Sequence, residues 1–98
     1  MPSFRVTMTI GALAPGTRPD RVLPIATDAA STLATAEASS VNVVRGEPRL
    51  TVRFTAEDAE LAEQVAQHVV HVTSSVAEVP AWTLTRRSRD RWYTLKRA

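Results

Sequence analysis

The chain has 98 residues, of which 44% are apolar and 22% charged, a balance typical of a folded globular protein. It contains no cysteine, which excludes disulfide bonds, thiolate metal sites and cysteine nucleophiles. The N-terminus has neither a basic nor a long apolar segment, so we expect a cytoplasmic protein without a membrane span. At this length we expect one domain that spans residues 1–98.

Charge is distributed unevenly along the chain. Residues 1–85 carry six arginines and nine acidic residues, a net −3, whereas residues 86–98 carry six basic residues and one acidic residue, a net +5. A basic end on a mildly acidic body is typical of proteins that contact a polyanion. We therefore divide the chain into a core of residues 4–85 and a basic strand or tail of residues 86–98.

Strict alternation of apolar and polar residues over 4–10 predicts the first strand. A helix should follow the loop, with Thr17 as a candidate N-cap. Pro24 would remove a backbone hydrogen bond from such a helix, so a later start at Asp20 is the slightly preferred alternative. We expect this helix to fade through residues 35–40.

The next segment reads as a hairpin, with strands over residues 41–44 and 49–54 joined by a turn over residues 45–48. Its second strand alternates strictly. The apolar residues on one side are Leu50, Val52 and Phe54, and the polar residues on the other are Arg49, Thr51 and Arg53. This pattern predicts a sheet with one buried face and one open, polar face.

A second helix should begin at Thr55 as N-cap and end near Pro80. Strands are expected over residues 81–85 and 91–96, separated by a polar break over residues 86–90. The inward-facing positions predict a core made of Phe4, Val6, Met8, Ile10, Val22, Ile25, Ala29, Leu33, Leu50, Val52, Phe54, Leu61, Val65, Val69, Val72 and Leu84.

The order strand–helix–strand–strand–helix–strand over residues 4–85 resembles the ferredoxin-like fold. That resemblance implies an α+β domain, with a four-stranded antiparallel sheet and two helices on one of its faces. The strand expected over residues 91–96 would be an extra C-terminal strand. The fold hosts many unrelated functions, so it does not name one.

The open face of that sheet is the first candidate interaction surface. It should collect Arg5, Thr7, Thr9, Arg49, Thr51, Arg53, Thr83 and Thr85. Three interpretations stay open: a solvated face, a face for a protein partner or a second copy, and a face for nucleic acid. The RNA-recognition version of this fold stacks bases on aromatic residues, whereas these positions hold arginine and threonine.

The basic C-terminal segment is the second candidate surface. Its polyanion-binding residues would be Arg86, Arg87, Arg89, Arg91, Trp92, Tyr93, Lys96 and Arg97. Arginine interleaved with aromatic residues suits phosphates and stacked bases. The alternative is an edge strand that charge protects against unwanted pairing, anchored to the core by one aromatic residue.

We expect no catalytic residue, metal or cofactor. His68 and His71 lie three residues apart on the second helix but lack further ligands nearby. The start Met1-Pro2, followed by a strand, resembles the tautomerase superfamily, in which a strand-leading proline is the general base; the close hairpin departs from that layout. The sequence therefore favours a non-enzymatic protein-interaction or assembly domain, a homodimer or bound to a protein partner, with nucleic-acid binding as the alternative.

Overall fold

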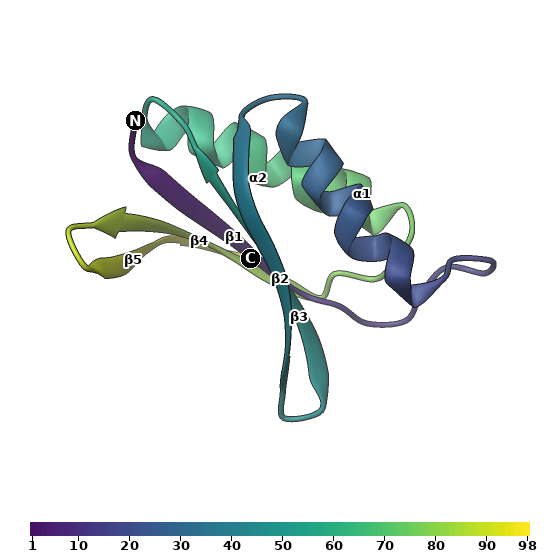
Figure 1. Cartoon of the computed structure of the whole chain (residues 1–98). Coiled ribbons are helices and arrows are strands. Elements are labelled where there is room, and N and C mark those ends of the chain that lie inside the picture. Colours follow the sequence, from purple (N-terminus) through teal and green to yellow (C-terminus); the bar gives the residue numbers. More distant parts are fainter.

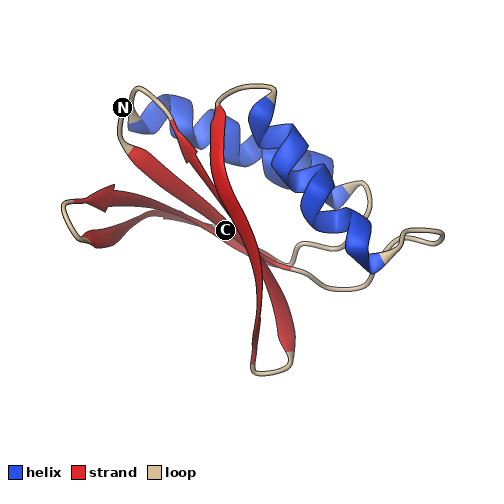
Figure 2. Ribbon diagram, viewed as in Figure 1, coloured by secondary structure: helices blue, strands red, loops and turns tan.

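The computed structural model describes residues 1–98 as a five-stranded antiparallel sheet with two helices over one face (Figures 1 and 2). The elements are β1 (Ser3–Thr9), α1 (Pro19–Ser31), β2 (Thr35–Val44), β3 (Glu47–Thr55), α2 (Ala59–Ser74), β4 (Ala81–Ser88) and β5 (Arg91–Arg97). The strand order is β2-β3-β1-β4-β5, so β2 and β5 are the edges. The expected α+β class is confirmed. The sheet has five strands rather than the four of the ferredoxin-like plan, because the expected C-terminal strand, β5, pairs with β4.

The central strands β1 and β3 contribute most of the large buried side chains of the core. Phe4 pairs with Phe54 and Val6 with Val52, and all four side chains are completely buried. The rings of Phe4 and Phe54 stack with their centroids 5.9 Å apart. The predicted register is therefore confirmed, since a slip of one residue would have turned every one of these side chains outward.

The helical side of the core differs from the prediction. Leu33 and Leu61 were expected inside, but they are 56% and 40% exposed. Ile25 and Val72 are only half-buried. Small residues take their places, and the buried alanines are Ala26, Ala29, Ala30, Ala56, Ala62, Ala66 and Ala77. A stripe of large apolar residues indicates which side of a helix is buried. The residues in closest contact with the rest of the core, however, are alanines, whose small side chains allow close packing.

The first helix starts within one residue of the preferred start at Asp20, whereas Thr17 and Thr55 are not the N-caps of the two helices. α1 begins at Pro19 after Arg18, which makes no side-chain cap bond, and it continues through the exposed Pro24. α2 is capped by Asp58, whose carboxylate accepts the Leu61 N–H at 2.9 Å. Thr55 instead ends β3. Aspartate accepts this bond as a charged group, which also suits the positive end of the helix dipole.

Residues 35–40, expected to continue the first helix, are strand. β2 runs from Thr35, opposite Thr55, to Val44, opposite Glu47, with a bulge near Glu37. Pairing along the whole of β3 outweighs the helical preference of alanine and glutamate in this segment. Similarly, β4 extends to Ser88, through most of the predicted polar break. The two hairpins, β2–β3 and β4–β5, extend away from the helices (Figure 1).

Candidate functional site: an arginine cluster on the open face

The sheet face that points away from the helices brings together all eight residues predicted for it. Across β1 and β3, Arg5 pairs with Arg53, Thr7 with Thr51 and Thr9 with Arg49. Across β1 and β4, Thr85 lies opposite Arg5 and Thr83 opposite Thr7. Directly opposite residues of an antiparallel pair share a face, so these side chains form one surface. The hydroxyl groups of Thr7 and Thr51 are 3.3 Å apart at its centre.

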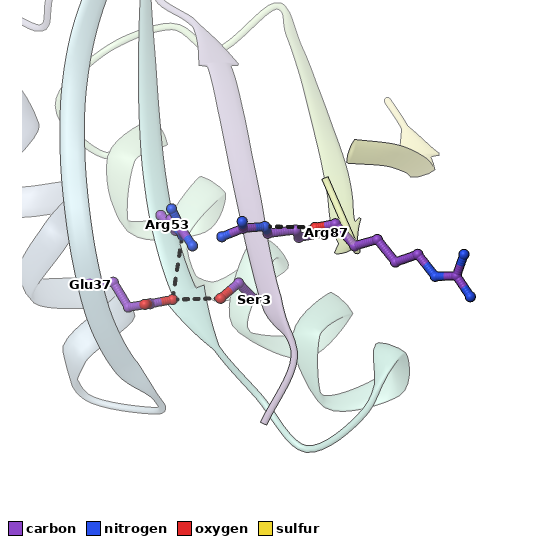
Figure 3. Close-up of polar contacts among 5 residues, drawn as sticks. Ser3, Glu37, Arg53 and Arg87 are labelled. Atoms are coloured by element: carbon purple, nitrogen blue, oxygen red, sulfur yellow. Dashed lines mark hydrogen bonds and ion pairs between the residues drawn. The ribbon is translucent and has the colours of Figure 1, made fainter. Parts of the chain in front are cut away.

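The dominant feature of this surface is a set of three arginines from neighbouring strands, Arg5, Arg53 and Arg87, which we call the arginine cluster. Partial burial, followed by the charges of Arg53 and Arg87, lowers the pKa of Arg5 below its ordinary value. The side chain of Arg87 crosses β1 towards Arg53, which lies on the other side of β1 (Figure 3). The cluster therefore concentrates positive charge at the centre of the open face.

One carboxylate contacts the arginine cluster. Glu37 lies 3.5 Å from the Nε of Arg53 and accepts a hydrogen bond of 2.8 Å from the Ser3 hydroxyl (Figure 3). The contact between Glu37 and Arg53 is an ion pair and not a hydrogen bond, since the buried Nε of Arg53 has no hydrogen-bond partner. The Nε of Arg49 is also buried without a partner. Both nitrogens are buried, so they do not offer donors to a ligand that approaches from solvent.

Trp92 joins the cluster from β5. Its register position opposite Arg87 places it on the open face. The guanidinium carbon of Arg5 lies 3.9 Å from the centroid of the indole ring, and that of Arg53 lies 5.4 Å from it. These distances define cation–π contacts that hold the arginine side chains in place. Because arginines already contact the half-buried ring, Trp92 is not a free platform for stacking bases.

A polar hollow of about 260 Å³ lies beside the cluster, between β1, β3 and β2. Its walls are formed by Arg5, Ala38, Ser39, Ser40, Asn42, Thr51 and Arg53. Guanidinium, hydroxyl and amide groups are the donors that bind carboxylate or phosphate oxygens. The sequence did not predict that β2 lines a hollow with Arg5 and Arg53. Most of the β2 residues in its wall fall within residues 35–40, where the sequence predicts the end of the first helix.

The predicted polyanion-binding residues do not form one surface. By register, Arg87, Trp92 and Arg97 share the open face. Arg86 lies over the Phe4 ring on the helical side at 5.8 Å, and Lys96 forms an ion pair of 2.7 Å with Glu63 of α2. The remaining three are exposed: Arg89 and Arg91 around the turn, and Tyr93 along β5. Alternation places Trp92 and Thr94 on the open face. The register shift between Thr94 and Lys96 then reverses the pattern, so that Lys96 lies on the helical side and Arg97 on the open face.

The other candidate positions lie apart from this surface. The Nε2 of His68 is 3.3 Å from the Thr32 hydroxyl, and no group of three or more His, Cys, Asp or Glu side chains that could hold a metal ion is present. The carbonyl of Pro2 accepts the Ala56 N–H at 3.3 Å. Neither helix is long and apolar enough to cross a membrane.

No protein-family model matches the chain, and neither the curated proteins nor the solved structures contain a significant match to it.

Proposed function

We propose that the chain is a non-enzymatic binding domain that holds an acidic segment of a partner protein on its open sheet face and C-terminal strand. The observation that carries this proposal is the imbalance of the arginine cluster, in which Arg5, Arg53 and Arg87 face a single carboxylate, that of Glu37. Arginine binds carboxylates through two parallel hydrogen bonds, which supply both affinity and orientation.

The same charges argue against two copies that pair through this face. Face-to-face packing would oppose one arginine cluster to another, and like charges across an interface cost free energy. An acidic segment avoids this cost, because its carboxylates carry the charge opposite to that of the arginine cluster.

Nucleic acid is the second candidate. It is favoured by Arg97, which lies opposite Thr83 and so adds a further positive charge to the open face. Phosphate groups suit arginine as well as carboxylates do. The central strands offer no aromatic side chain for stacking, however, and the Trp92 ring is in contact with Arg5. The acidic protein segment therefore ranks first.

We also infer that the domain belongs to the ferredoxin-like type. The order β2-β3-β1-β4, with one helix after β1 and the other after β3, supports this inference. A cytoplasmic location and a single domain over residues 1–98 belong to the same proposal, supported by the cysteine-free composition and by one continuous core cluster.

Fluorescence anisotropy with a labelled peptide of alternating glutamate and threonine tests the proposal at low salt. The double variant Arg5→Gln/Arg53→Gln should bind at least about tenfold more weakly, because each charge-assisted contact contributes about 1.5–3 kcal/mol. The matched control is Arg18→Gln/Arg21→Gln, which removes two arginines from exposed positions at the start of α1. This control should retain most of the affinity.

Labelled single-stranded and double-stranded oligonucleotides distinguish the two candidates in the same assay. If an oligonucleotide binds and the peptide does not, the partner is nucleic acid and not an acidic protein segment. No binding of either probe, or an equal loss in both double variants, would refute a role for the arginine cluster.

A further inference from the structure

Beyond its bulge near Glu37, the edge strand β2 lacks the usual defences against pairing with another strand. From Ala38 to Val44 it contains no charged residue and no proline. Val41 and Val43 are 50% and 69% exposed, although they are large apolar residues. Edge strands of stable monomers are normally protected by charge, proline or bulges. The opposite edge, β5, has such protection in its basic residues and in a register shift against β4.

The turn after β2 determines which backbone groups of this edge are free. Arg45 and Gly46 have φ angles of 54° and 82°, as required by a two-residue type I′ turn. Val44 and Glu47 close this turn as a hydrogen-bonded pair. Because hydrogen-bonded and non-bonded positions alternate along an antiparallel strand, the N–H and C=O groups of Ser39, Val41 and Val43 point away from β3.

We propose that a second copy of the chain pairs with this edge, β2 against β2 and antiparallel, with the two-fold axis at Val41. Ser39 of each copy then lies opposite Val43 of the other, and the two Val41 residues face one another. Three outward residues per copy provide about six backbone hydrogen bonds across the axis. The result is a continuous sheet through two copies, a symmetric arrangement.

The charges at the two ends of the uncharged stretch are complementary in this register. Glu37, at the bulge, precedes it and Arg45, in the turn, follows it, so antiparallel pairing about Val41 brings the acidic end of each stretch towards the basic end of the other. Parallel pairing would instead place Glu37 beside Glu37. On β5, antiparallel pairing about Thr94 would oppose Arg91 to Arg97, which is unfavourable.

The apolar surface next to the edge favours the same partner. A groove of about 420 Å³ lies on the helical side of the β2–β3 hairpin. Its lining includes Val22, Leu23, Val41, Val43 and Leu50. Pairing at β2 brings the exposed valines of the two copies together at this groove, which removes apolar surface from water. The surface is distinct from the open face, so this proposal does not depend on the partner of the arginine cluster.

Sedimentation velocity of the full chain at rising micromolar concentrations is the first test. The chain should dimerise, whereas Val41→Pro should be monomeric, because proline removes an N–H that is used only between copies. Leu95→Lys, at a 43% exposed position on the other edge, should dimerise as the unmodified chain does. A chain that stays monomeric, or a Val41→Pro variant that still dimerises, would overturn the proposal.

Single cysteines test the position of the axis, since the chain has none of its own. Two Val41→Cys residues would have Cα atoms about 5.5 Å apart, within the range of about 4.4–6.8 Å for a disulfide. Val43→Cys is the matched control, because its symmetry mate lies four positions along the strand, about 13 Å away. Mild oxidation should link the first variant and not the second. Equal linking of both would refute this register.

Discussion

Replacing Glu37 by glutamine removes the only carboxylate that contacts the arginine cluster and keeps an oxygen that can accept the Ser3 hydroxyl bond. The positive charges of Arg5, Arg53 and Arg87 are then no longer offset by Glu37. We expect Glu37→Gln to lower the free energy of unfolding and, at the same time, to strengthen binding of an anion, because the internal competitor for Arg53 is gone.

The magnitude follows from the geometry of the pair. Two unit charges 3.5 Å apart attract by about 1 kcal/mol in water and by about 5 kcal/mol at an effective dielectric constant near 20. The side chains of Arg53 and Glu37 are 28% and 35% exposed, so solvent screening and desolvation cancel most of the larger value. We therefore expect a loss of about 1 kcal/mol, which corresponds to a decrease in Tm of about 4–8 °C.

Thermal unfolding followed by circular dichroism, at low salt and at about 1 M NaCl, measures this loss. The difference in Tm between the variant and the unmodified chain should shrink by more than half at high salt, where the Debye length is about 3 Å. A variant that is as stable as the unmodified chain at low salt, or a loss that does not depend on salt, would refute the electrostatic account of the cluster.

Two further predictions concern the fold. Asp58→Ala should cost about 1 kcal/mol in chemical denaturation, because the first turn of α2 loses its cap, whereas Asp58→Asn should keep most of the stability. Phe54→Ala should cost about 3–5 kcal/mol, since the ring is fully buried against Phe4, while Leu61→Ala at a 40% exposed position should cost far less. Equal costs for Phe54 and Leu61 would show that the large residues of α2 face the sheet.

The open face illustrates what could be predicted from the sequence. Alternation in β1 and β3 places Arg5, Thr7 and Arg53 on one side whatever the other elements do, because successive side chains of a strand point to opposite faces. That local rule was enough to predict the buried Phe4 and Val52 as well. It was also enough to name the surface on which the candidate site lies.

The site itself depends on neighbours that are distant in the sequence. Glu37 reaches Arg53 only because residues 35–40 pair with β3, and their composition favours a helix when no neighbouring strand is considered. Trp92 meets Arg5 because β5 joins the sheet beside β4, which no local pattern in β1 indicates.

The sequence by itself determined the types of most elements, with residues 35–40 as the exception, and also the faces of the central strands and the uneven charge, since each depends on residues a few positions apart. Only the tertiary structure decided which arginines meet, which carboxylate offsets them, and that β2 is an edge without protective charge. The physical reason is that strand order and helix packing depend on free energies summed over many distant contacts. No single segment carries that information.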